Sequence, residues 1–231
     1  MKILKYIPNT ITCLNLASGC MAIVMAFEGH LQGAILWIMM AAFFDFMDGL
    51  TARLLKAYSP LGKELDSLSD VVSFGVAPGM ALYVLLRQAV ASMGGGEGLA
   101  YLPYLAFVIP VFSGLRLAKF NLDERQTSSF IGMPVPAHAL FWGSLVCYVQ
   151  PVLPVGAGWV LYGGLVLAFL SSYLLVSEIP MFSMKVKTLA WRGNEVRYVL
   201  LVCGLLFIAF FGFLGVAGTV VLYFILSLFN K

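Results

Sequence analysis

Apolar runs of about 20 residues recur along this chain from Ile11 almost to its end, and they restrict the fold more than any other feature. A run of that length spans the roughly 30 Å hydrocarbon core of a bilayer as an α-helix. Because lipid offers no hydrogen-bond partners, repeated crossing requires backbone groups to pair within helices or a closed barrel. Only 11% of the residues are charged and 61% are hydrophobic, whereas soluble domains have roughly 25% charged residues. The sequence therefore predicts an all-α, polytopic membrane helical bundle.

About eight apolar segments are expected to be transmembrane helices, with ends defined only to within a few residues. They lie near residues 10–27, 31–55, 65–86, 99–118, 135–151, 157–176, 196–212 and 214–229.

The distribution of cations predicts the orientation of this bundle. With the N-terminus in the cytoplasm, every lysine and arginine except Arg87 falls on the cytoplasmic side of the eight predicted spans. Cytoplasmic loops of membrane proteins are enriched in such cations, so both termini are expected inside. The net charge of +3 then reflects cations beside an anionic leaflet, and no nucleic-acid partner is expected.

Four aspartates interrupt the apolar pattern where the second span ends and the third begins. Asp45 and Asp48 are three residues apart, and Asp66 and Asp70 are four apart. Each pair therefore shares one face of a helix. The connection at residues 57–62 is short and contains proline and glycine, which makes the two helices antiparallel neighbours. All four carboxylates are expected to converge.

These carboxylates require a compensating partner. An aspartate at the centre of a span costs about 2.5–3.5 kcal/mol, so four together cost on the order of 10 kcal/mol. One or two Mg²⁺ or Mn²⁺ ions, which prefer hard oxygen ligands, would cancel the charge and leave positions open for phosphate oxygens. An alternative without metal pairs the aspartates with Arg53, Lys56 and Lys63. A second alternative is a divalent-cation transporter, although all four aspartates lie on one side of the membrane.

The acidic segment carries a resemblance to a known family. Its pattern, Asp45-x2-Asp48-Gly49-x2-Ala52-Arg53-x8-Gly62-x3-Asp66-x3-Asp70, resembles the signature of the CDP-alcohol phosphotransferases. Further segments resemble the membrane-embedded phosphatidylserine synthases of bacteria and archaea, and Lys119 departs from the arginine expected there. These segments are Ile7-Pro8-Asn9-x2-Thr12 and residues 66–78, 116–121, 130–137 and 175–177.

The resemblance implies a role for each matching residue. The metal ligands, for two ions of Mg²⁺ or Mn²⁺, would be Asp45, Asp48, Asp66 and Asp70, with Asp70 also the catalytic base. CDP-diacylglycerol would be bound by Asn9, Thr12, Gly49, Ala52, Arg53, Ser59 and Gly62. L-Serine would be bound by Arg116, Lys119 and Asn121, with Arg125 on the same side.

The reaction implied is a direct displacement, in which the phosphatidyl group passes from CDP-diacylglycerol to L-serine and CMP leaves. Glycerol 3-phosphate, inositol phosphate or choline are alternative acceptors, but a phosphorylated acceptor would need a basic pocket beyond Arg53. The resemblance also implies a homodimer in a bacterial or archaeal cytoplasmic membrane, with the active site on the cytoplasmic side. We expect one domain over residues 1–231, with a catalytic core of about 1–176 and two further spans at about 196–229.

Overall fold

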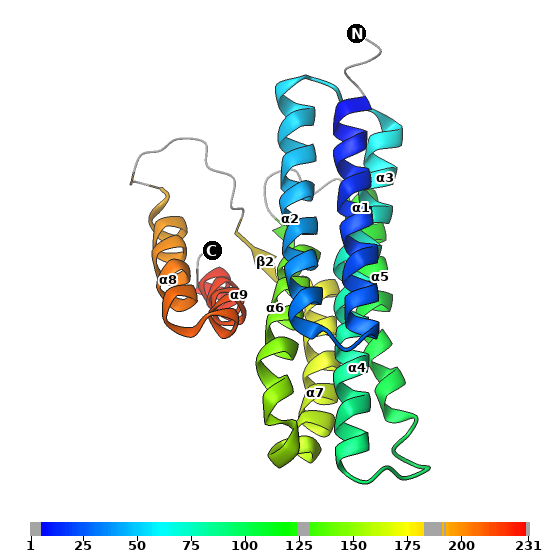
Figure 1. The fold of residues 1–231 in the computed structure, drawn as a ribbon. Coiled ribbons are helices and arrows are strands. Elements are labelled where there is room, and N and C mark those ends of the chain that lie inside the picture. The colour runs from blue at the N-terminus through cyan, green and yellow to red at the C-terminus, as the bar shows by residue number, and fades with distance from the viewer. Residues whose placement is uncertain (1–5, 124–129, 183–190, 192, 230–231) are drawn as a thin grey trace.

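Helices run through almost the whole of the computed structural model, which describes residues 6–123, 130–182, 191 and 193–229 (Figure 1). The predicted all-α bundle is therefore confirmed. In chain order the elements are α1 (Tyr6–Phe27), α2 (Leu31–Leu54), α3 (Pro60–Asp70), the π-helix η2 (Val71–Val76), α4 (Ala77–Ser92), the 3₁₀-helix η3 (Leu102–Phe107), α5 (Val108–Leu122), β1 (Phe130–Ile131), α6 (Val135–Val149), the 3₁₀-helix η5 (Gln150–Val152), α7 (Leu153–Val176), β2 (Pro180–Met181), α8 (Glu195–Phe211) and α9 (Phe213–Phe229).

Helices α1 and α2 form an antiparallel hairpin that packs through small side chains (Figure 1). Ala22 and Ala26 on α1, and Ala34 and Ala41 on α2, are buried. Small residues let helix backbones approach closely where lipid provides no hydrophobic driving force between helices. Gly29 closes the hairpin with φ +82°, a left-handed conformation that glycine adopts without a steric penalty.

The third helical stretch begins earlier than the sequence predicted. Ser59 has extended backbone angles, and its side chain accepts a hydrogen bond from the Gly62 amide at 3.0 Å. Pro60 occupies the first turn, where its missing N–H leaves no bond unmade. Pro60 therefore starts α3 rather than belonging to the preceding turn. From there α3, η2 and α4 continue as one run of 33 residues.

The two short strands are a departure from the predicted all-helical chain. Strands β1 and β2 pair antiparallel, with Phe130 opposite Met181 and Ile131 opposite Pro180. The ribbon ties the segment before α6 to the segment after α7. A two-residue pairing is too short to show hydrophobic periodicity, so it could not be predicted from the residue pattern.

Within the part of the chain that the structure describes, five helical stretches are long and apolar enough to cross a membrane by length and composition. They are Tyr6–Phe27, Leu31–Leu54, Pro60–Ser92, Leu102–Leu122 and Val135–Val176. The last is a run of 42 residues that contains both α6 and α7. Large apolar side chains on the outside of the bundle, such as Val155 and Trp159, are exposed, as lipid contact requires. The predicted count of eight spans stays a prediction.

Of the C-terminal helices, α9 packs against α6, and α8 packs against α9 (Figure 1). Gly212, with φ +55°, forms the bend between them. In Figure 1, α9 is seen nearly end-on while α1 and α2 are seen from the side, so α9 runs across the bundle direction. Tyr223 on α9 donates a hydrogen bond to the Phe182 carbonyl at 3.0 Å, which fixes α9 to the segment that follows β2.

Close packing of α1 on η2 depends on Gly19 and yields a stability prediction. A β-carbon at Gly19 would lie 2.7 Å from Ser73 Cα, whereas a β-carbon at Gly114 on α5 would meet nothing within 4 Å. Gly19→Ala should lower stability by about 1–3 kcal/mol, because backbone atoms have to move. Gly114→Ala, the matched control, should keep or raise it, because alanine favours helix. Thermal unfolding in detergent measures both, and an unchanged midpoint for Gly19→Ala would contradict this packing.

Candidate active site

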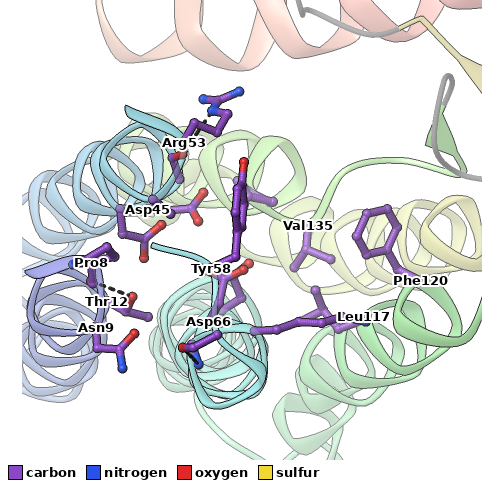
Figure 2. Close-up of a pocket in the computed structure, with 18 of the residues that line it drawn as sticks. Pro8, Asn9, Thr12, Asp45, Arg53, Tyr58, Asp66, Leu117, Phe120 and Val135 are labelled. Atoms are coloured by element: carbon purple, nitrogen blue, oxygen red, sulfur yellow. Dashed lines mark hydrogen bonds between the residues drawn. The ribbon is translucent and has the colours of Figure 1, made fainter. Parts of the chain in front are cut away.

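One end of the bundle contains a cavity of about 590 Å³. It lies where the start of α1, the end of α2, the start of α3, the end of α5 and the start of α6 meet (Figure 2). Its walls are Pro8, Asn9, Thr12, Asp45, Asp48, Gly49, Ala52, Arg53, Ala57, Tyr58, Ser59, Gly62, Lys63, Asp66, Asp70, Arg116, Leu117, Phe120, Pro134, Val135 and Pro136.

Three of the four predicted aspartates form a tight group in this cavity. One carboxylate oxygen from each of Asp45, Asp48 and Asp66 lies within 4.8 Å of the others. Helix α2 supplies two of them from one face, and α3 supplies the third from the facing helix. The antiparallel arrangement predicted from the short connection brings them together.

The group lacks cationic partners within the described residues. No lysine or arginine of residues 6–123, 130–182, 191 and 193–229 forms an ion pair with these aspartates. Arg53 donates instead from Nε to the Gly49 carbonyl at 3.0 Å, and Lys63 donates from Nζ to the Asn121 carbonyl at 3.4 Å. The described residues therefore do not adopt the alternative arrangement, in which Arg53, Lys56 and Lys63 neutralise the aspartates.

Two buried carboxylate oxygens in the group have no hydrogen-bond partner in the described chain, Asp48 Oδ2 and Asp66 Oδ1. Leaving charged oxygens buried without a partner is costly. Clustered carboxylate oxygens are the ligands that Mg²⁺ and Mn²⁺ prefer. The residues present therefore fit a divalent cation, and this cluster of three acidic side chains can hold one.

Asp70 is more deeply buried than Asp45 and Asp66. It lines the same cavity but is 7% exposed, and it is not one of the three residues grouped within 4.8 Å. Its Oδ1 accepts a hydrogen bond from Asn15 Nδ2 at 3.2 Å. Helix α1 packs against α3 and covers this side of Asp70.

All seven residues predicted to bind CDP-diacylglycerol line the cavity: Asn9, Thr12, Gly49, Ala52, Arg53, Ser59 and Gly62. A β-carbon at Gly49 would meet nothing within 4 Å, so this face of α2 is open to a ligand. At Gly62 a β-carbon would come 2.9 Å from Asn9 Oδ1, so glycine lets α3 approach α1 there.

The residues predicted to bind serine divide into two groups. Arg116 is 4% exposed, lines the cavity, and has an Nε without a hydrogen-bond partner among the described residues. Its guanidinium lies 5.1 Å from the centre of the Phe120 ring, at cation–π distance. Arg116 is therefore positioned to meet an anion in the cavity.

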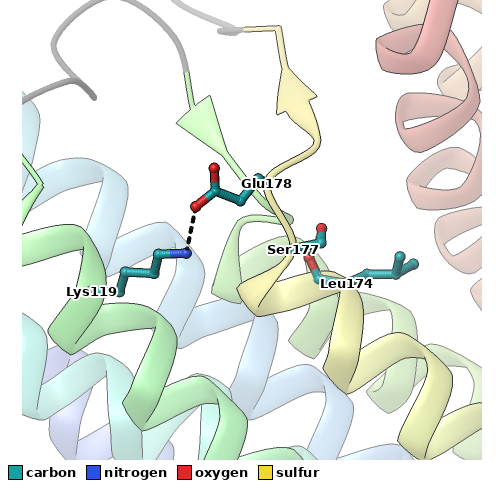
Figure 3. Close-up of polar contacts among 4 residues, drawn as sticks. All are labelled: Lys119, Leu174, Ser177 and Glu178. Carbon is teal, nitrogen blue, oxygen red and sulfur yellow. Dashed lines mark hydrogen bonds and ion pairs between the residues drawn. The ribbon is translucent and has the colours of Figure 1, made fainter.

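Lys119 and Asn121 are not brought to the cavity wall. Lys119 Nζ contacts Glu178 Oε1 at 3.2 Å, an ion pair between α5 and the segment after α7 (Figure 3). Asn121 Nδ2 donates to Ser67 Oγ at 2.8 Å. Both side chains join elements around the site. Arg125 lies outside the described residues.

Asn15, which contacts Asp70 from α1, was not among the predicted site residues. A signal for it was present. Asn9, Thr12, Asn15 and Ser18 recur every three residues in an otherwise apolar helix, which places them along one side of α1. The last three are buried, so the stripe faces protein rather than lipid.

Comparison with known proteins identifies the family. The model of the family described as CDP-alcohol phosphatidyltransferase matches residues 5–170. The chain belongs to the CDP-alcohol phosphatidyltransferase family. The matched residues contain all four aspartates and every residue that lines the cavity. They end before α8, so the two C-terminal helices lie outside the part of this phosphatidyltransferase that matches the family.

Several curated relatives share about a third of their residues with the chain. A CDP-diacylglycerol–serine O-phosphatidyltransferase of Bacillus subtilis is 36% identical over 150 residues, which cover 65% of this chain and 80% of the relative. One of Mycobacterium leprae is 36% identical over 190 residues, covering 78% of this chain but only 59% of the relative. An archaetidylserine synthase of Methanothermobacter thermautotrophicus is 33% identical over 137 residues, covering 58% and 54%.

The acidic group of this phosphatidyltransferase yields a metal-binding prediction. Asp66→Asn should weaken Mn²⁺ binding to the purified protein by at least about tenfold, because it removes a charged ligand from the group. Glu64→Gln is the matched control, since Glu64 is an exposed acidic residue on the same helix and should leave the affinity unchanged. Titration followed by electron paramagnetic resonance measures both. Equal affinities in the two variants would contradict the assignment of Asp66.

Proposed function

We propose that this chain transfers the phosphatidyl group of CDP-diacylglycerol to L-serine, forming phosphatidylserine and CMP. The observation that carries the proposal is the group of three aspartates whose oxygens lie within 4.8 Å of one another in a cavity that also contains Arg116. The relatives in Bacillus and Mycobacterium, named as serine O-phosphatidyltransferases, support serine as the acceptor.

Asp45, Asp48 and Asp66 would hold Mg²⁺ or Mn²⁺, and Asp70 would complete the site for a second ion. Bound there, the metal would supply Lewis-acid stabilisation of the phosphate oxygens. Without a bound cation the carboxylates would repel the diphosphate, because like charges close together are unfavourable.

The surrounding residues would orient CDP-diacylglycerol. The open face at Gly49 and Ala52 would admit the cytidine close to α2. Arg53 is exposed at the mouth of the cavity, where its guanidinium would pair with the diphosphate. Asn9, Thr12, Ser59 and Gly62 would form the side of the nucleotide site on α1 and α3. The acyl chains would stay in lipid throughout.

Asp70 would act as the general base. The serine hydroxyl oxygen forms a bond to the phosphorus that carries diacylglycerol, and the bond from that phosphorus to the CMP oxygen breaks. The hydroxyl proton passes to Asp70, and CMP leaves with the bonding electron pair. A single in-line displacement of this kind needs no covalent enzyme intermediate.

Arg116 would bind the serine carboxylate. It is buried, its Nε has no hydrogen-bond partner among the described residues, and it lies on the α5 wall of the cavity. A buried guanidinium gains strongly from a carboxylate that can accept two of its hydrogen bonds. Lys119 and Asn121 would bind serine only after breaking their contacts with Glu178 and Ser67.

The cellular setting follows from the charge pattern and the family. The active site and both termini would face the cytoplasm of a bacterium or archaeon, because nearly all cations lie on that side of the predicted topology. Residues of about 1–176 would form the catalytic core of one domain over residues 1–231. Helices α8 and α9 would be an addition to that core, in keeping with a family match that ends at residue 170. The functional unit would be a homodimer.

Release of CMP from CDP-diacylglycerol in mixed micelles tests the function. L-Serine should raise the rate strongly, whereas glycerol 3-phosphate, inositol phosphate and choline should not. Chelation of divalent cations should abolish release, and added Mg²⁺ or Mn²⁺ should restore it, because the aspartates would otherwise repel the diphosphate. A rate that serine leaves unchanged, with any of the other alcohols active, would exclude serine as the acceptor.

A further inference from the structure

Asn15 contacts the candidate base from outside the cavity. Its Nδ2 donates to Asp70 Oδ1 at 3.2 Å, and it is fully buried. An ionised carboxylate only accepts hydrogen bonds, so the amide nitrogen has to be the atom that faces Asp70. Asn15 does not line the cavity and is therefore not positioned to touch a substrate there.

The backbone around Asn15 is braced by the same helix that carries Asp70. Ser73 Oγ donates to the Asn15 carbonyl at 3.0 Å, and Ser69 Oγ donates to the Thr12 carbonyl at 3.3 Å. Both serines are fully buried. Three hydrogen bonds thus join one stretch of α1 to Asp70 and to a serine on either side of it, and Gly19 permits the close approach.

The helix changes its winding at this point. Asp70 is the last residue of α3, and the π-helix η2 starts at Val71 and includes Ser73. Short π-helical turns inside α-helices occur frequently at functional sites. Here the wider turn follows directly after the candidate base and carries the serine that braces Asn15.

Only one of the two polar atoms of the Asn15 amide has a hydrogen-bond partner among the described residues. Its Oδ1 is buried and has no hydrogen-bond partner within the described residues. If the residue at position 15 served only to pack α1 against its neighbour, a small apolar side chain would make that contact more stable, because an unpaired buried acceptor is unfavourable. The hydrogen bond to Asp70 is the contact that accounts for an asparagine at this position.

We propose that Asn15 is a positioning residue for Asp70. Its amide anchors Oδ1, so that the carboxylate is held in one rotamer and presents Oδ2 for proton transfer. This inference rests on the proposed function, in which Asp70 accepts the serine hydroxyl proton. Residues that orient a reacting group from behind typically change activity about 10–100-fold when they are lost.

The test compares Asn15→Ala with Ser18→Ala at saturating metal. Ser18 lies one turn further along α1 and is buried, and its one side-chain hydrogen bond among the described residues is to the Leu14 carbonyl of its own helix. Asn15→Ala should lower kcat about 10–100-fold, with KM for CDP-diacylglycerol and for serine within about threefold of the wild type. Ser18→Ala should leave both constants unchanged. A displaced α1 would instead raise KM for CDP-diacylglycerol, since Asn9 and Thr12 lie on the same helix.

Either of two results would overturn the proposal. The first is an Asn15→Ala enzyme with the kcat of the wild type, and the second is one whose activity falls because KM rises while kcat is unchanged. If Asn15→Ala yields no folded protein, Ser73→Ala removes only the brace on the Asn15 carbonyl. It should lower kcat by a smaller factor without changing KM, and an unchanged kcat would refute the proposal. A wild-type enzyme that releases no CMP with serine refutes the proposed function instead, so the two failures are distinguishable.

Discussion

Carboxylate repulsion in a lipid-solvated bundle is the constraint on which the rest of this structure depends. Asp45, Asp48 and Asp66 bring their oxygens within 4.8 Å of one another, and no lysine or arginine of the described chain forms an ion pair with them. In a medium of low dielectric, such a group is unstable unless cations neutralise it. A divalent cation that neutralises the aspartates would also explain why the cavity lies beside them. It would explain in the same way why α2 is open at Gly49 and why Arg116 lines the cavity wall.

The contacts around the aspartates fix the helices that carry them and do not neutralise their charge. Polar residues of α1 face inward and bond to the helix that carries Asp70, while the lipid side of the bundle is apolar. The ribbon of β1 and β2 and the ion pair of Lys119 with Glu178 join the ends of α5, α6 and α7 around the same end of the bundle. Rigid support of this kind lets a cavity keep its shape while a lipid substrate enters and leaves.

The sequence predicted what depends on composition and local spacing. Apolar runs predicted the helices, and the spacings of three and four residues predicted two aspartate pairs on facing helices. Every residue predicted to bind CDP-diacylglycerol, from Asn9 to Gly62, lines the cavity. Helix periodicity and motif spacing account for this shared location, because they fix which side chains share a face. Their binding roles stay predictions.

Features that depend on tertiary packing escaped prediction. The depth of Asp70 is set by α1 lying across it, and the π-helical winding of η2 has no distinct signal in residues 71–76. The Lys119 side chain pairs with Glu178, and the Asn121 side chain donates a hydrogen bond to Ser67. Both partners are distant in sequence, so the residue pattern could not reveal these contacts. The crossing direction of α9 depends on contacts with α6 and the Phe182 carbonyl, which a hydropathy pattern does not encode.

Anomalous diffraction from crystals grown with Mn²⁺ and CDP-diacylglycerol tests the central claim most directly. The account predicts anomalous density among Asp45, Asp48 and Asp66, with oxygen ligands at roughly 2.0–2.2 Å and the diphosphate on the same ion. Density absent from this group, with lysine or arginine side chains neutralising the aspartates in its place, would contradict it.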